Sequence, residues 1–99
     1  MEEYNISDDK SRLDLKLIHH VISNSYWAKD RSFEEVKRSI DNSICYGFYT
    51  ADKQIGFARV LTDFVTIAYL MDVFILEEYR GNGLSKILLT NILNDEQFN

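Results

Sequence analysis

Apolar residues in the first half of the chain recur at helical spacing in two places. Between residues 12 and 24 they predict an amphipathic helix whose buried side carries Leu13, Leu17, Ile18, Val21 and Ile22. A second helix is predicted to begin after Ser32, because Glu35 stands three residues later and completes a capping box. Its apolar stripe is expected to consist of Phe33, Val36 and Ile40.

The spacing of apolar residues changes from helical to strand-like in the second half of the chain. Three segments rich in β-branched and aromatic residues, 43–50, 54–62 and 66–76, are separated by short turns and predict an antiparallel meander. Both alternating faces of the third segment are apolar: one carries Ala68, Leu70, Phe74 and Leu76, and the other Ile67, Tyr69, Met71, Val73 and Ile75. A sheet covered by helices on both faces explains this pattern.

A short strand at 4–6 and a last helix at 83–93 complete the predicted order, β-α-α-β-β-β-α. The last helix is expected to bury Leu84, Ile87, Leu88 and Ile92. The predicted fold class is therefore α/β in the broad sense (α+β), a mostly antiparallel sheet with helices on both faces. With 99 residues the chain is expected to form a single domain over 1–99.

Charge and cysteine content narrow the possible partners. The net charge of −5 argues against a nucleic-acid-binding face or an anionic membrane surface, and suits cationic partners such as amines. Cys45 is the only cysteine, which indicates a reducing, cytoplasmic setting, and no apolar run is long enough to span a membrane. The adjacent His19 and His20 point about 100° apart on a helix, so no metal site is expected.

Two of the four glycines, Gly81 and Gly83, stand where the last helix begins. Glycine costs about 1 kcal/mol relative to alanine within a helix, so a tight loop, or close approach of the backbone to a ligand, explains them better. Free N–H groups at a helix N-terminus can bind an anion such as phosphate, and Arg80 adds a guanidinium group suited to phosphate oxygens. The spacing matches neither a Walker A loop nor a dinucleotide-binding motif. A turn with a helix cap is the alternative.

The stretch "DVFILEEYRGNGLSKILL" (72–89) resembles the acetyl-CoA-binding motif of the GNAT N-acetyltransferase family. That motif is a strand followed by [Q/R]-x-x-G-x-[G/A] and a helix. Here it reads Arg80-Gly81-Asn82-Gly83-Leu84-Ser85, with serine in place of the last small residue. "NSYWAKD", "SICYG" and "GFARVLTD" are similar to stretches of one small bacterial subfamily. The resemblance covers almost the whole chain and implies a partial GNAT fold.

This resemblance implies an acetyl-CoA-dependent N-acetyltransferase that acts on a small or peptide amine. The cofactor's pyrophosphate is expected on the loop formed by Arg80, Gly81, Asn82, Gly83, Leu84 and Ser85. Its pantetheine arm is expected to pair with the strand residues Val73, Phe74, Ile75 and Leu76. In this family a bulge in the strand directs one amide at the thioester carbonyl, and an amide near Val73 or Phe74 corresponds to it.

Four further residues are candidates for catalysis or for binding the acceptor amine. Asp72 is a carboxylate within an apolar strand and is either a general base or a hydrogen-bond acceptor for a neighbouring loop or Arg59. Arg59 is expected on the same sheet face, where it could border an acceptor pocket. Tyr26 and Trp27 fall in the loop between the first two helices, where the family commonly shapes the acceptor site; core packing is the alternative.

A complete GNAT domain continues after the last helix with a strand, a helix and two more strands. This sequence ends at Asn99, so we expect a truncated domain. It could be an impaired acetyltransferase, a homodimer that covers the exposed strand 66–76, or a domain completed by another chain; we expect the homodimer. A non-catalytic CoA-binding remnant or a dimeric interaction protein is the alternative to an enzyme.

Overall fold

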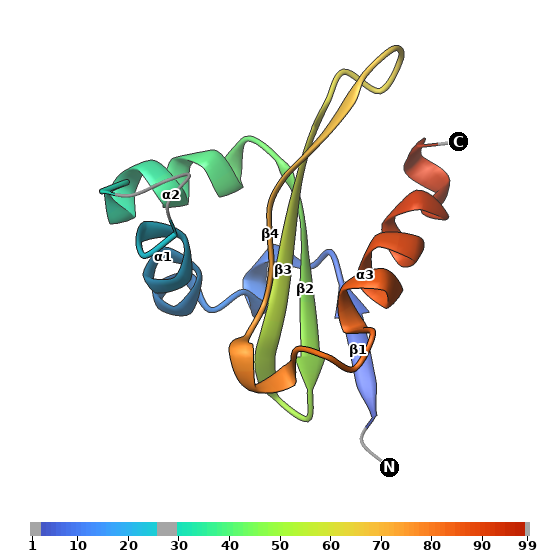
Figure 1. The fold of residues 1–99 in the computed structure, drawn as a ribbon. Coiled ribbons are helices and arrows are strands. Elements are labelled where there is room, and N and C mark those ends of the chain that lie inside the picture. Colours follow the sequence, from blue (N-terminus) through green and yellow to red (C-terminus); the bar gives the residue numbers. More distant parts are fainter. Residues whose placement is uncertain (1–2, 26–29, 99) are drawn as a thin grey trace.

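A four-stranded sheet with the strand order β1-β2-β3-β4 separates two groups of helices (Figure 1). The computed structural model describes residues 3–25 and 30–98. Its elements are β1 (Tyr4–Ser7), η1 (Lys10–Arg12), α1 (Leu15–Ser23), α2 (Phe33–Asp41), β2 (Ile44–Thr50), β3 (Lys53–Thr62), β4 (Ala68–Ile75), η2 (Glu77–Tyr79), α3 (Leu84–Leu93) and η3 (Glu96–Phe98). All three strand pairs are antiparallel, so the predicted order and fold class are confirmed.

Each face of the sheet has its own hydrophobic core. The helices α1 and α2 pack on one face, where the core includes Ile18, Ile22, Val36, Ile40, Cys45, Phe57 and Phe74. Helix α3 packs on the other face, where the core includes Phe48, Ile55, Val60, Ile75, Leu84, Leu88 and Ile92. Side chains of β2 and β3 are divided between these two cores, which explains why both faces of these predicted strands are apolar.

The helix predicted for 12–24 is shorter in the structure. Residues 10–12 form the turn η1, and α1 begins at Leu15 because the Asp14 carboxylate caps it by accepting from the Leu17 N–H at 3.0 Å. The capping box of Ser32 and Glu35 is confirmed. Two helical side chains expected to be buried are not: Phe33 is 37% exposed and Ile87 is 49% exposed. Ile67, Tyr69 and Leu70, expected in a strand covered on both faces, are exposed as well.

The connection between β3 and β4 is longer than the short turn predicted between residues 62 and 66. The Asp63 carboxylate accepts hydrogen bonds from the N–H groups of Val65, Thr66 and Ile67 at 2.9–3.1 Å. These backbone hydrogen bonds hold the pKa of Asp63 well below its usual range. The carboxylate thus organises residues 63–67 as a loop, and β4 begins only at Ala68.

Strand β4 contains a bulge at Asp72. Phe57 pairs with Phe74 and Arg59 pairs with Met71, so the one residue between them on β3 is opposed by two on β4, Asp72 and Val73. The extra residue reverses the alternation of faces: Ala68 and Leu70 lie on the α3 side, and beyond the bulge Val73 and Ile75 lie there as well. The continuous alternation predicted for 66–76, which grouped Phe74 with Leu70, was therefore wrong.

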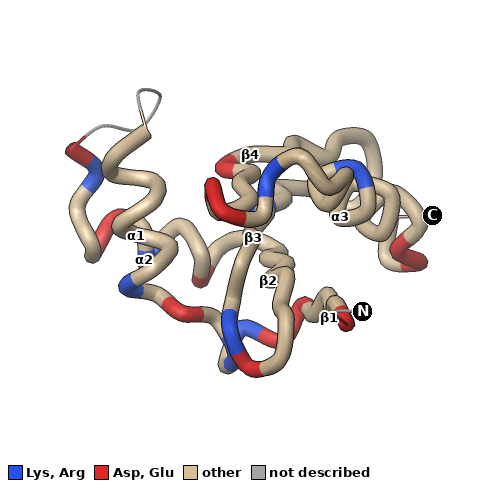
Figure 2. Tube along the Cα trace, turned by 60° about the horizontal axis from the view of Figure 1, so that its bottom comes forward, with Lys and Arg blue, Asp and Glu red and all other residues tan. Residues whose placement is uncertain are grey.

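Charged residues of both signs are dispersed along the described part of the chain (Figure 2). Blue and red segments are spread over several helices, strands and loops, and neither sign gathers on one element. In residues 3–25 and 30–98, no helix is both long enough and apolar enough to cross a lipid bilayer.

Candidate functional site

The glycine loop leads from the end of β4 into α3 through two residues in the left-handed region. Gly81 has φ 85° and Gly83 has φ 73°. An added Cβ would meet no atom within 4 Å at either position, so the need for glycine comes from the backbone conformation and from what approaches the loop. The loop thus has the unusual backbone that the paired glycines predicted.

The N-terminus of α3 presents backbone N–H groups without a capping side chain. Gly83 is the N-cap residue and makes no side-chain cap. The first intrahelical hydrogen bond runs from the Ile87 N–H to the Gly83 carbonyl at 3.3 Å, so the N–H groups of Leu84, Ser85 and Lys86 have no intrahelical acceptor. Together with the helix dipole, these groups favour an anion.

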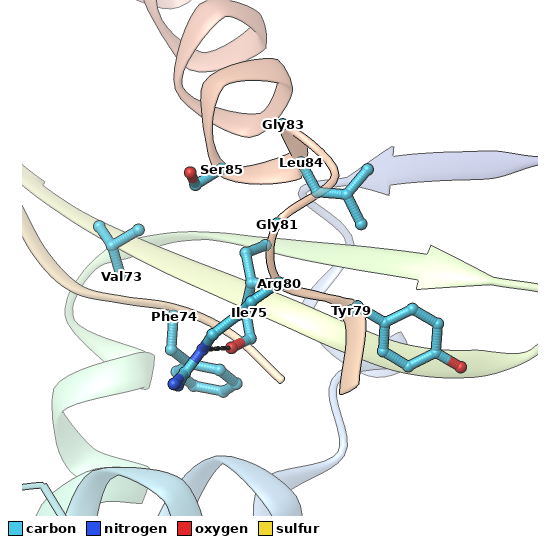
Figure 3. A pocket seen from close by; sticks show the side chains of 9 residues that line it. All are labelled: Val73, Phe74, Ile75, Tyr79, Arg80, Gly81, Gly83, Leu84 and Ser85. Carbon is cyan, nitrogen blue, oxygen red and sulfur yellow. Dashed lines mark hydrogen bonds between the residues drawn. The ribbon is translucent and has the colours of Figure 1, made fainter. Parts of the chain in front are cut away.

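A pocket of about 260 Å³ brings this loop together with the end of β4 (Figure 3). It is lined by Val73, Phe74, Ile75, Tyr79, Arg80, Gly81, Gly83, Leu84 and Ser85. Eight of these nine residues were predicted as cofactor-binding from the sequence. The ninth, Tyr79, was missed, because an aromatic residue in a turn gives no sequence signal that separates a pocket wall from ordinary packing.

Two predicted cofactor residues lie outside this pocket. Leu76 is half-buried between the two cores, and its N–H donates to the Ile55 carbonyl at 2.8 Å. Asn82 is exposed, and its side-chain amide donates to the Tyr79 carbonyl at 3.4 Å. Both residues make hydrogen bonds within the chain, and their contact with a ligand stays a prediction.

Asp72 lies at the bulge of β4 with φ 54°, a left-handed conformation that non-glycine residues seldom adopt. One of its carboxylate oxygens, Oδ2, accepts from the Arg59 Nε at 2.9 Å and from the Arg31 Nη1 at 3.0 Å. The side chain is 2% exposed. Of the two sequence-based interpretations, these ion pairs favour the structural one, in which Asp72 accepts hydrogen bonds from Arg59 and a neighbouring segment.

Arg59 is also buried and does not line the pocket beside the glycine loop. Its Nη1 donates to the Ser43 hydroxyl at 3.0 Å, and its Nη2 lies 3.6 Å from the Met71 sulfur. Its predicted position on the same sheet face as Asp72 is confirmed. Arg31 was missed by sequence reasoning because it belongs to a loop, where spacing gives no periodicity. Tyr26 and Trp27 lie outside the described residues.

Cys45 is buried in the core beneath α1 and α2, 1% exposed. Burial raises the pKa of its thiol to about 11, which makes it a poor nucleophile near neutral pH. Within residues 3–25 and 30–98, no group of three His, Cys, Asp or Glu side chains has a metal-binding arrangement.

Comparisons with known proteins agree with one another. The sequence profile of the acetyltransferase (GNAT) family matches residues 15–96. A Gibberella zeae protein named a putative acetyltransferase is 31% identical over 94% of this chain and 63% of its own length. An uncharacterized N-acetyltransferase of Gracilaria tenuistipitata is 35% identical over 73% of this chain and 42% of its own length. The matches thus span about two fifths to two thirds of the length of these two relatives.

A crystal structure from Xanthomonas campestris, of a protein assigned to the GNAT family, superposes with a TM-score of 0.94. It is 42% identical, and the match covers 99% of this chain and 70% of that one. The superposition therefore includes the sheet, all three helices and the glycine loop. With the profile match over residues 15–96, it shows that this chain belongs to the GNAT acetyltransferase family.

Proposed function

We propose that this chain binds acetyl-CoA in the pocket between β4 and the glycine loop and transfers the acetyl group to an amine. One observation carries the proposal: the uncapped N-terminus of α3 and the bulged strand β4 open onto the same pocket. The first feature suits a diphosphate, and the second suits an extended arm that reaches back along the strand. Family membership supports both assignments.

The residues of the loop fit the phosphate end of acetyl-CoA. Gly81 and Gly83 let the backbone approach closely, and the N–H groups of Leu84 and Ser85 are positioned to donate to phosphate oxygens. Arg80 adds a positive charge at the rim. Val73, Phe74 and Ile75 form the wall along which the pantetheine arm would lie.

Acetyl-CoA supplies the acetyl group as a thioester, which an amine attacks with release of the thiol. At the bulge of β4, a backbone N–H near Val73 or Phe74 is our candidate donor to the thioester carbonyl oxygen, where negative charge develops. Holding the amine and the thioester together supplies much of the remaining rate enhancement. Asp72 as general base, and Tyr26, Trp27 and Arg59 as acceptor-site residues, stay predictions.

A second candidate function is non-catalytic: a CoA-binding module or a dimeric interaction protein. The outer edge of β4 favours association, because it is the last strand of the described sheet and Tyr69 and Leu70 on it are 61% and 42% exposed. We therefore propose a homodimer through strand 66–76. A single truncated domain, a cytoplasmic location, and the absence of nucleic-acid and membrane partners stay predictions from the sequence.

Calorimetric titration with acetyl-CoA, followed by a thiol-release assay with a panel of amines, tests the proposal. Saturable binding and amine-dependent thiol release are expected. Binding without turnover would support the CoA-binding module, whereas neither binding nor turnover would leave only an interaction role. Arg38→Gln is a suitable control because Arg38 is an exposed arginine on α2, away from the pocket.

A further inference from the structure

Asp72 joins three separate parts of the chain through one buried carboxylate oxygen. It lies on β4, Arg59 lies on β3, and Arg31 precedes the N-cap of α2. The side chains of Asp72 and Arg59 are 2% and 9% exposed, and that of Arg31 is 23% exposed. Ion pairs this well screened from water are stronger and more directional than surface pairs.

The same network reaches the other end of α2. Arg59 donates to the Ser43 hydroxyl at 3.0 Å, and that hydroxyl donates to the Ser39 carbonyl in the last turn of α2 at 2.7 Å. Arg31 stands immediately before the first cap of the helix, and Ser43 immediately after its last. Helix α2 is therefore tied to the bulge of β4 at both of its ends.

The bulge requires such support because its backbone is strained. Asp72 has φ 54°, and its side chain is on the α2 side with Arg59 and Arg31. Asp tolerates this region better than most non-glycine residues, but the conformation is still uncommon within a strand and persists where its surroundings hold it. Two guanidinium groups on one carboxylate oxygen help to fix the side chain, and through it the direction of the next amide, that of Val73.

We propose that Arg31 and Arg59 are positioning residues that act through Asp72 to hold the β4 bulge in the conformation that aims the Val73 amide into the pocket. The catalytic consequence rests on the proposed function, but the control of the bulge does not. Arg31 is the more informative of the two arginines, because it is partly exposed and lies outside the sheet, so its replacement leaves the strands intact.

The first experiment needs no ligand. Backbone chemical shifts of Asp72, which report whether its φ is left-handed or extended, are compared in the wild-type chain, Arg31→Gln and the control Arg38→Gln. We expect the Asp72 shifts to move toward strand values in Arg31→Gln and to stay unchanged in Arg38→Gln. Asp72→Asn, which tolerates the left-handed region but lacks the charge, is expected to move in the same direction. Unchanged Asp72 shifts in Arg31→Gln would overturn the proposal.

The second experiment separates positioning from simple loss of binding. In Arg31→Gln we expect kcat to fall at least about tenfold, a part of what losing one oxyanion donor costs, while KM for acetyl-CoA stays within about twofold because the glycine loop is untouched. A raised KM with unchanged kcat would contradict the positioning role. Failure of the wild-type chain to bind acetyl-CoA would instead refute the proposed function, and the chemical shifts would still decide whether Arg31 holds the bulge.

Discussion

The Arg80 Nε donates a 2.9 Å hydrogen bond to the carbonyl oxygen of Ile75, the last residue of β4 (Figure 3). This bond links the end of the strand to the glycine loop. Among residues 3–25 and 30–98, no hydrogen bond occupies the two terminal nitrogens of the guanidinium group, so they are available to a ligand. Arg80 therefore has two separable roles, one in the shape of the loop and one in its charge.

Replacing Arg80 by glutamine is expected to weaken acetyl-CoA binding by roughly tenfold or more, because a charged hydrogen bond to phosphate contributes about 1.5–3 kcal/mol. Calorimetry on Arg80→Gln, with Arg38→Gln as the matched control, measures the effect. The difference between the two variants should shrink as salt is added. Equal affinities of the two variants would count against a phosphate contact at Arg80.

Gly83 allows backbone strain and ligand access to be measured separately. Asparagine tolerates the left-handed region better than other side chains do, so Gly83→Asn should change the free energy of unfolding by less than about 1 kcal/mol, whereas Gly83→Val should cost about 1–3 kcal/mol. Both side chains project toward the space beside the loop, which is open in the protein alone. Both variants should therefore lose acetyl-CoA binding. Wild-type affinity in Gly83→Asn would refute the loop assignment.

The edge of β4 should govern association. The chain is expected to elute as a species of about twice 11.6 kDa in size-exclusion chromatography with light scattering. Tyr69→Lys should shift it to the monomer, because a lysine on an edge strand opposes pairing. Ile87→Lys, at a similarly exposed position on α3, is the control and should leave the dimer intact. A wild-type monomer at 11.6 kDa would contradict the proposed homodimer.

Removing the hydroxyl group from Tyr49 and from Tyr46 should change the free energy of unfolding in opposite directions. Within the described residues, the buried Tyr49 hydroxyl has no hydrogen-bond partner, whereas the Tyr46 hydroxyl donates to Asp95 at 2.6 Å and accepts from Gln97. Tyr49→Phe should raise the free energy of unfolding by up to about 1 kcal/mol, and Tyr46→Phe should lower it by about 1 kcal/mol or more. Urea denaturation measures both; a larger loss in Tyr49→Phe would show the interpretation to be wrong.

Burial of Cys45 predicts a loss of stability at alkaline pH. The pKa of its thiol is about 11 in the folded chain, against an ordinary value of 9.0, so the unfolded chain releases this proton first. The contribution of this thiol to stability should therefore be fully present below about pH 9. As the pH rises toward 11, the free energy of unfolding should fall by at most roughly 3 kcal/mol from this group. Cys45→Ala should flatten the fall measured between pH 8 and 10. An equally steep fall in that variant would exclude the thiol as its cause.

Sequence patterns predicted the parts of this fold that depend on residues close together in the chain. The capping box of Ser32 and Glu35, the meander and the glycine loop depend on near neighbours in the chain, and the structure has all three. The exposure of Phe33 and Ile87 could not be predicted from local patterns. Helical periodicity identifies the apolar side of a helix, but not how much of that side the neighbouring elements cover.

Predictions for the candidate site also succeeded for residues close together in the sequence and failed for distant partners. The loop residues form a contiguous motif and were predicted together, whereas the Arg31–Asp72 pair joins positions 41 residues apart. Nothing local marks Arg31 as a partner of Asp72. The bulge was anticipated only through the family resemblance, and without its exact position the faces of β4 could not be assigned.

The extra residue in β4 sets a limit on insertions and deletions in this chain. Removing Asp72 would restore the regular two-residue alternation and keep Val73 and Ile75 on the α3 core, but it would delete the bulge and its buried carboxylate. Inserting one further residue there would instead turn Val73 and Ile75 toward the α1 and α2 core. A change in length here therefore either removes the bulge or reverses the faces of the strand beyond it. Alignments of relatives should therefore carry no gap at this position, even where the neighbouring side chains differ.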